Sequence, residues 1–387
     1  MLRRMQRIYL DYNASTPIAP RVAEVMRRMM GEAFGNPSSS HWAGRPARAA
    51  VETARAQVAT LLGCSPEEII FTSGGSESNN LALKGLFFAK PQAHAHIITT
   101  QVEHPAIVEP CRFLERLGAR ITWLPVDGSG CVNPEDLRRA ITAETLLVSV
   151  MHANNEIGTI QPIAECAAIA REHGVPFHTD AAQSVGKIPT RVDDLGVDLL
   201  TLAGHKFYGP KGVGALYVRA GTVLEPLLHG AAHESGRRAG TESALLAAAL
   251  GEAGTLAGDL APMQAVKTLR DRLRDALAAE LGEQVVFHGH PERVLPNTLN
   301  VSFLGTTGAE VLAGLEGVAA STGSACHSGR VELSPVLRAM GVSPEAGQGA
   351  VRFSLGRETT AAEVDALLRL IATAPWRRAR TPVPSAP

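Results

Sequence analysis

Residues 175–218 contain three short apolar runs, VPFHTD (175–180), DLLTLAG (198–204) and GVGALYV (212–218), separated by polar and glycine-rich segments. Each run has the length and composition of a buried β-strand. The pattern extends upstream through EEIIFTSGG (67–75), HIITT (96–100), ARITWLPV (119–126) and TLLVSVM (145–151), with helix-compatible stretches between the runs. Such alternation is typical of a mainly parallel sheet covered by helices, so the chain is predicted to be an α/β protein.

The chain has 387 residues, of which 45% are hydrophobic and 19% charged, with a formal net charge of -1. This length favours two domains. The near-zero charge argues against a broad basic surface for nucleic acid or anionic lipid, so we expect no direct nucleic-acid partner and no membrane partner. A small-molecule substrate fits this composition better.

The five cysteines are widely spaced and include no C-x-x-C pair. This argues against a disulfide framework or a self-contained zinc site, and a reducing cytoplasm is the expected location. The start MLRRMQRIYLDYN is basic but has no apolar signal-peptide core, and no segment has the length and hydropathy of a membrane span. A soluble protein is therefore expected.

A second pattern follows an Ala/Leu-rich helical stretch at 242–281. NTLNVSFL (297–304) and GAVRFSLG (349–356) are predicted strands, and TAAEVDALLRLIATA (360–374) is a predicted helix. The final residues, PWRRARTPVPSAP (375–387), are rich in proline and polar residues and are predicted to form a flexible tail.

Three loops carry residues suited to chemistry. In FTSGGSESNN (71–80), a Gly74-Gly75 turn leads into a helix at Ser76, which is an arrangement that can bind an anion such as phosphate. The alternative is an ordinary helix cap formed by Ser76 with the asparagines at 79 and 80.

Asp180 and Lys206 each follow the end of a predicted strand, in PFHTDAAQSVGK (176–187) and LAGHKFYGPKGVG (202–214). Ligands of parallel sheets collect at the carboxyl ends of the strands. Taken singly, Asp180 could be a turn cap and Lys206 a surface lysine. Together, a phosphate cradle, a carboxylate for a pyridinium nitrogen and a lysine for a Schiff base are what a pyridoxal phosphate enzyme needs.

The order of motifs along almost the whole chain resembles that of cysteine desulfurases, which are class V aminotransferase-like, fold type I pyridoxal phosphate enzymes. The motifs that carry this resemblance are YLDYNASTP, GNPSSSHWAGRPAR, FTSGGSESNN, VEHPAIVEP, MHANNEIGTIQPI, HTDAAQSVGK, GHKFYGPKGVGALYVR, RRAGTES, STGSAC and VRFSLGR. The resemblance implies a homodimer whose subunits have a large cofactor-binding domain (15–258), a smaller α+β domain (1–14 and 259–374) carrying the Cys326 loop, and the tail (375–387).

The resemblance also implies roles for single residues. Lys206 would hold pyridoxal 5′-phosphate covalently and then move protons at the substrate's α-carbon. Asp180 would pair with the pyridinium nitrogen, and Gln183 would hydrogen-bond the phenolic oxygen of the ring. His104 would stack on the ring and assist proton transfer, although a histidine before a proline is more often a packing residue.

The phosphate would be bound by Gly75, Ser76 and His205, with Thr241 reaching across from the other subunit. Thr241 could instead be the N-cap of the helix that follows it. Ala203 stands where the family often has a serine, so one phosphate-binding hydroxyl is missing; Ser76 replaces the usual threonine, and GAAHE (230–234) replaces the more common Gly-Gly-Gly-Gln-Glu. Weaker phosphate binding is a possible consequence, unless main-chain donors compensate.

Arg352 would bind the substrate carboxylate through its planar guanidinium, helped by Asn155, which would also contact the cofactor. A structural ion pair is the alternative role of Arg352. Cys326, in the small and polar stretch STGSACHSG (321–329), would be the nucleophile that takes sulfur from L-cysteine as a persulfide, leaving L-alanine. The adjacent His327 could promote the thiolate.

The long segment after Cys326 (327–349) resembles the desulfurase type that delivers sulfur to an iron–sulfur scaffold or a tRNA thiolation enzyme, and Cys326 could ligate a transient cluster there. No intrinsic metal site is expected; His94 and His96 lie on one strand face but lack a third ligand. Rival functions are a selenocysteine lyase or β-eliminating cystine lyase, which would need Cys326 less or not at all, and a non-catalytic sulfur- or cluster-binding partner protein.

Overall fold

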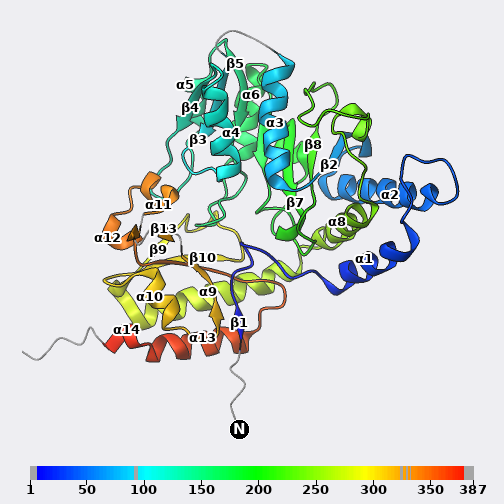
Figure 1. The fold of residues 1–387 in the computed structure, drawn as a ribbon. Coiled ribbons are helices and arrows are strands. Elements are labelled where there is room, and N and C mark those ends of the chain that lie inside the picture. The colour runs from blue at the N-terminus through cyan, green and yellow to red at the C-terminus, as the bar shows by residue number, and fades with distance from the viewer. Residues whose placement is uncertain (1–6, 91–94, 323–325, 328–329, 332, 379–387) are drawn as a thin grey trace, which may run out of the picture.

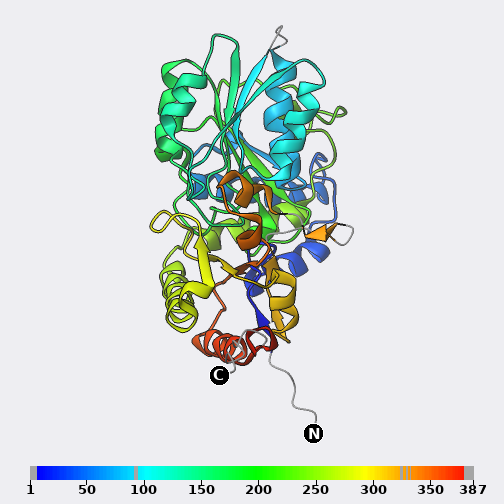
Figure 2. The same cartoon turned by 90° about the vertical axis from the view of Figure 1, so that its left-hand side faces the viewer.

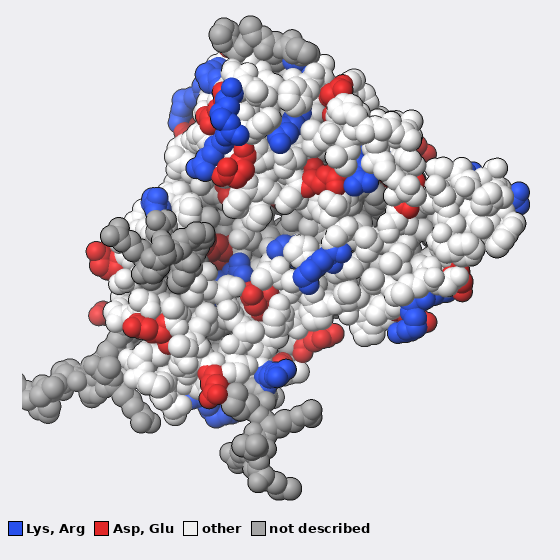
Figure 3. Space-filling view, in the orientation of Figure 1, with Lys and Arg blue, Asp and Glu red and all other residues white. Residues whose placement is uncertain are grey.

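The computed structural model describes residues 7–90, 95–322, 326–327, 330–331 and 333–378, with the backbone alone at 326–327, 330–331 and 377–378. A large sheet with helices on both faces lies above a smaller sheet backed by helices, and the N-terminal segment runs between these two layers (Figure 1, Figure 2). Positively and negatively charged side chains are interspersed over the face seen in Figure 3, in keeping with the net charge of -1.

The large sheet has seven strands in the order β2-β8-β7-β6-β5-β3-β4. The strands are β2 (Ile69–Thr72), β3 (His96–Thr100), β4 (Arg120–Leu124), β5 (Thr145–Ser149), β6 (Phe177–Asp180), β7 (Leu199–Ala203) and β8 (Gly214–Val218). All seven predicted strands are confirmed. The sheet is mainly parallel as predicted, and β8 is the one strand of the seven that runs in the opposite direction to the others.

Successive residues of the central strands face opposite layers of helices because side chains alternate along a strand. In β3, for example, Ile97 packs under α3 (Gly75–Ala89) and α4 (Pro105–Glu115), whereas Ile98 belongs to the core on the other face. That second face is covered by α1 (Pro20–Glu32), α2 (Gly44–Leu62), α5 (Pro134–Ala140), α6 (Ile163–Glu172), α7 (Val192–Leu195) and α8 (Ala244–Ala257). Burial on both sides explains the nearly continuous apolar sequence of these strands.

The smaller sheet is antiparallel and has the order β12-β15-β10-β9. Its strands are β9 (Val285–His288), β10 (Thr298–Phe303), β12 (Ser321–Thr322) and β15 (Ala350–Ser354). Valine and phenylalanine side chains of β10 and β15 pack on α9 (Pro262–Leu281), α10 (Gly308–Ala313) and α13 (Ala361–Thr373). The alternate residues are polar, and Asn300 reaches the large sheet's loops by donating to the Glu156 carbonyl.

The first residues of the chain belong to the small sheet's surroundings. β1 (Ile8–Tyr9) pairs in parallel with β11 (Val318–Ala319), and Asp11 forms a bridge with Ser354 of β15. From there the chain crosses to α1. The predicted domain boundaries at 14/15 and 258/259 stay a prediction.

Three short helices lie in the C-terminal part of the described chain: α11 (Pro335–Ala339), α12 (Pro344–Gly347) and α14 (Pro375–Arg378). The last of these corrects part of the tail prediction for 375–387, since the Trp376 ring lies 5.2 Å from the Phe303 ring and is packed against the small sheet. Residues 379–387 lie outside the described residues. In the described part of the chain no single helix could span a membrane; only the bent pair 244–257 and 262–284 meets that test together.

A buried ion pair fastens the loop that precedes α8 to the large sheet. The Glu234 carboxylate accepts from both terminal nitrogens of Arg55, at 2.7 and 2.8 Å, and from the Phe71 amide at 3.0 Å. The Glu234 side chain is 1% exposed and its φ is +49°, a conformation that non-glycine residues rarely adopt. Side-chain bonds therefore hold a strained backbone in place.

Replacing Glu234 with alanine should destabilise the fold by about 3–5 kcal/mol, because the Arg55 guanidinium and the Phe71 amide lose their buried acceptor. Urea denaturation of the apoprotein measures this loss. Arg138→Ala is the matched control: its ion pair with Glu172 is exposed on both sides, so a change below about 1 kcal/mol is expected. Equal effects of the two substitutions would contradict the assignment.

Candidate active site

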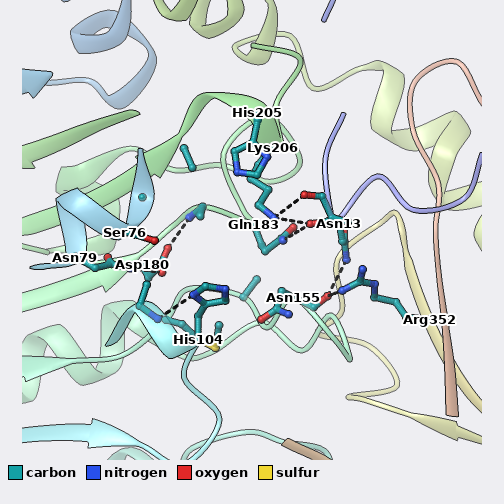
Figure 4. A pocket seen from close by; sticks show the side chains of 17 residues that line it. Asn13, Ser76, Asn79, His104, Asn155, Asp180, Gln183, His205, Lys206 and Arg352 are labelled. Carbon is teal, nitrogen blue, oxygen red and sulfur yellow. Dashed lines mark hydrogen bonds between the residues drawn. The ribbon is translucent and has the colours of Figure 1, made fainter. Parts of the chain in front are cut away.

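A cavity of about 410 Å³ lies between the carboxyl ends of the large sheet's strands and the polar face of the small sheet (Figure 4). Ten residues predicted from the sequence line it: Gly75, Ser76, His104, Asn155, Asp180, Gln183, Ala203, His205, Lys206 and Arg352. The strand-end rule explains this convergence, because β2, β6 and β7 finish at the same edge of the sheet.

The first turn of α3 forms one wall. Gly74, with φ at +147°, precedes the helix, and a Cβ built at Gly75 would stand 3.3 Å from the Ala203 Cβ. Glycine therefore allows this turn to approach β7 closely. The amides of the first helical turn have no acceptor within the helix, and Gly75 and Ser76 line the cavity. The alternative interpretation of this loop, a cap formed by the side chains at 76, 79 and 80, is wrong: Gly74 is the N-cap and its position carries no side-chain cap.

Asp180 is the last residue of β6 and is buried. Its two carboxylate oxygens accept hydrogen bonds from the Asn79 side chain at 2.7 Å and from the Ala182 amide at 2.9 Å. These bonds hold the carboxylate in place at the cavity. Among the described residues no cation forms an ion pair with it. Asn79, which the sequence interpretation treated only as part of a cap, is thus a support for the predicted carboxylate.

Lys206 follows β7 in a short 3₁₀ turn, and its amine points into the cavity (Figure 4). Nζ donates to the carbonyls of Asn13 at 2.8 Å and Ala14 at 3.0 Å. Burial, with a further contribution from the positive charge of Arg352, lowers the pKa of Lys206 to about 8. About a tenth of the amine is therefore uncharged at pH 7, and the uncharged amine is the form that acts as a nucleophile.

Two histidines of the cavity are uncharged at neutral pH. Desolvation lowers the pKa of His205 to about 4, and it also lowers the pKa of His104. The His104 ring faces the cavity, where Nδ1 accepts from the Ala106 amide at 3.1 Å. The neutral His104 ring thus carries its proton on Nε2.

Arg352 comes from β15, so the small sheet supplies the cation on the opposite wall. One terminal nitrogen bonds Asp11 at 2.7 Å and the other donates to the Asn155 carbonyl at 3.0 Å. Arg352 thus forms a structural ion pair, which was its alternative role, and it also lines the cavity. Because its partners hold the guanidinium in place, it is preorganised for a carboxylate.

Gln183 and Asn13 connect the two walls (Figure 4). The Gln183 amide nitrogen donates to the Asn13 carbonyl at 2.9 Å, and the Asn13 amide nitrogen donates to the Asn155 carbonyl at 3.1 Å and the Thr298 hydroxyl at 2.8 Å. Sequence reasoning missed Asn13 as a site residue. The available signal was a polar amide shortly after an apolar run, within YLDYNASTP.

One predicted site residue, Thr241, does not line the cavity, and a second, Cys326, is described by its backbone alone. Thr241 is exposed and lies outside it, and Ser243, not Thr241, caps α8 by accepting from the Leu246 amide. The backbone of Cys326 lies in β13 (Cys326–His327), which pairs with β14 (Arg330–Val331), but its side chain lies outside the described part of the structure.

The described residues contain no cluster of metal-ligating side chains. His96 is buried, and both of its ring nitrogens bond threonine hydroxyls, Thr145 at 2.9 Å and Thr122 at 2.8 Å. These bonds leave its ring no free nitrogen for a metal. His94 lies outside the described residues.

Known proteins match nearly the whole chain. A cysteine desulfurase IscS from Dictyoglomus turgidum is 49% identical over 94% of this chain and 93% of its own length. Among solved structures, a NifS-like protein has a TM-score of 0.89 and 38% identity over 95% of this chain and 98% of its own. A structure of SspA in complex with cysteine has a TM-score of 0.81 and 38% identity over 91% of this chain and 100% of its own.

The sequence model of the family described as Aminotransferase class-V matches residues 8–367, and so takes in both sheets and every described wall of the cavity. By this match and by the identity to its relatives, the chain belongs to the aminotransferase class-V family.

Proposed function

We propose that this chain is a cysteine desulfurase whose cavity binds pyridoxal 5′-phosphate and whose Cys326 receives the sulfur of L-cysteine as a persulfide. Enzymes of this family use that cofactor. The observation that carries the proposal is the meeting, in one cavity, of a partly uncharged lysine, a buried carboxylate, a helix N-terminus and an arginine. The cysteine desulfurases and cysteine-bound SspA among the similar proteins support the choice of substrate.

The residues present fit the cofactor. Gly75, Ser76 and the uncharged His205 offer donors and space for a phosphate beside the α3 N-terminus, and the missing hydroxyl at Ala203 leaves the main-chain amides as the principal donors. The buried Nδ1 of His205 has no partner in the described structure, so this ring has hydrogen-bonding capacity to spare. Asp180 offers the carboxylate for a pyridinium nitrogen.

When bound, the cofactor supplies a sink for the electrons released at the substrate's α-carbon. Arg352 binds the substrate carboxylate and Asn155 helps to orient it. The uncharged amine of Lys206 accepts the proton from the α-carbon, and Nε2 of His104 carries a proton at the same cavity. The Cys326 thiolate then bonds to the substrate sulfur as the carbon–sulfur bond breaks, and the electron pair of that bond stays with the carbon side. L-alanine forms when the freed β-carbon takes up one proton and Lys206 returns the other to the α-carbon.

We also propose a homodimer in which Thr241 contributes to the cavity of the partner subunit. Thr241 is exposed and does not line the cavity of its own subunit. A cytoplasmic location is supported by four free cysteines among the described side chains. An iron–sulfur scaffold or a tRNA thiolation enzyme is the proposed acceptor of the sulfur, with Cys326 as a possible transient cluster ligand in such a complex.

Replacing Lys206 with alanine should abolish the visible absorbance of the bound cofactor and reduce alanine formation from L-cysteine by at least about 10³-fold, because the variant has neither the covalent attachment point nor the proton acceptor. Lys211→Ala, five residues along the same loop but exposed, is the control and should behave as wild type. Normal turnover in the Lys206 variant would exclude the proposed mechanism.

Capture of pyridoxal phosphate by the apoprotein should accelerate with pH. With a Lys206 pKa of about 8, the uncharged fraction rises about ten-fold between pH 7 and pH 9 and then levels off. Stopped-flow absorbance gives this profile. A rate that keeps rising ten-fold per unit to pH 10 would show that the protein does not lower this pKa.

The Cys326→Ala variant should keep the visible absorbance of the bound cofactor. It should no longer release sulfide from L-cysteine in the presence of a reductant, because it lacks the thiol on which the persulfide forms. Cys64→Ala is the control: burial raises the pKa of Cys64 to about 12, so it holds almost no thiolate at neutral pH. Wild-type sulfide release by the Cys326 variant would favour a lyase that acts without this thiol.

A further inference from the structure

Lys187 is a second lysine beside the cavity, and the proposed mechanism does not use it. It is 8% exposed, does not line the main cavity within the described structure, and lies behind Gln183. Its Nζ donates to the side-chain oxygen of Gln183 at 2.7 Å and to that of Asn13 at 3.2 Å. Both partners are amides, and no ion pair to Lys187 is present among the described residues.

The buried position of Lys187 and the cations near it favour an uncharged amine. Burial, together with the positive charges of Lys206 and Arg352, lowers the pKa of Lys187 well below its usual range. An uncharged amine has two N–H groups, and the structure offers it two acceptors, on Gln183 and Asn13. The two N–H groups of an uncharged Lys187 therefore match the two acceptors around it.

These bonds fix which way the Gln183 amide faces. Its oxygen is engaged by Lys187, and one N–H is engaged by the Asn13 carbonyl. The flipped amide would set the Gln183 oxygen against that carbonyl, which can only accept, and would leave one N–H of Lys187 without its acceptor. The second N–H of Gln183 makes no further hydrogen bond among the described residues, and Gln183 lines the cavity.

We propose that Lys187 is a positioning residue that locks the Gln183 amide so that its free N–H is presented to an acceptor oxygen in the cavity. The inference rests on the proposed function, in which that acceptor is the phenolic oxygen of the cofactor. Lys187 acts only through Gln183 and touches neither cofactor nor substrate.

A purely space-filling role does not account for this lysine. A methionine side chain has nearly the same length and would fill the same space without an amine to desolvate, whereas a buried amine near two cations is unfavourable. What the lysine adds is its pair of donors. A residue kept for those donors should affect the cofactor's spectrum as well as the stability of the fold.

The test compares Lys187→Met with wild type. Titration of the apoprotein with pyridoxal phosphate, followed by tryptophan fluorescence, should show a dissociation constant raised about ten-fold, as expected for one lost hydrogen bond. The pH at which the cofactor's visible absorbance changes should rise by about one unit, since a donor N–H stabilises the deprotonated phenolic oxygen.

Ser184→Ala is the matched control. Ser184 is fully buried on the same turn, and its hydroxyl bonds only the Ala181 carbonyl among the described groups. This variant should lower thermal stability while leaving the dissociation constant and the absorbance profile unchanged. The comparison separates loss of a buried hydrogen bond from loss of the Gln183 lock.

The double variant Gln183→Leu with Lys187→Met shows whether Lys187 acts through Gln183. It should match Gln183→Leu alone in both measurements, because no amide is left to orient. This comparison also serves if Lys187→Met does not fold by itself, because the double variant replaces both partners of the bond together.

Two results would overturn the inference: a wild-type dissociation constant and absorbance profile in Lys187→Met, or a further shift when Lys187→Met is added to Gln183→Leu. Both leave the proposed function intact, because wild type still shows its visible absorbance. A wild-type protein that binds no pyridoxal phosphate would refute the proposed function, and the inference with it.

Discussion

The amide of Asn13 is the interaction on which the site depends. Its nitrogen donates to Asn155 and Thr298, and its oxygen accepts from Lys187 and Asn297, so all four hydrogen-bonding positions are filled. These partners come from both sides of the cavity. A single buried side chain therefore sets the spacing between the two walls, and a fully satisfied buried network of this kind permits one arrangement only.

The walls themselves follow from the two-residue period of β-strands. In β15, Val351 and Phe353 face the small core, which leaves Arg352 to face the large sheet across the cavity. On the other side, Asp180 ends β6 and Ala203 ends β7, where parallel strands open onto a common edge. The apolar pattern that builds the two cores thus also aims the polar groups at each other.

Local sequence was sufficient for the seven strands of the large sheet, because their apolar runs and glycine-rich ends are local signals. It was also sufficient to single out Asp180 and Lys206, which follow strand ends. The antiparallel direction of β8 had no local signal, because the apolar composition of GVGALYV suits a buried strand that pairs in either direction. Asn13 and Lys187 were missed for a related reason: the hydrogen-bond partners of their side chains lie up to 285 residues away, and only the fold reveals them.

The place of the first strand has a consequence for how the protein is made. The main-chain N–H of Asn13 donates to the Ser354 hydroxyl across 341 residues of sequence, and β1 pairs with β11 in the C-terminal part of the chain. During synthesis the segment before α1 must wait, unpaired, until almost every later residue has left the ribosome. The carbonyls of Asn13 and Ala14, which accept from Lys206, therefore reach their final positions only late in synthesis, so the lysine is oriented last among the groups of its wall.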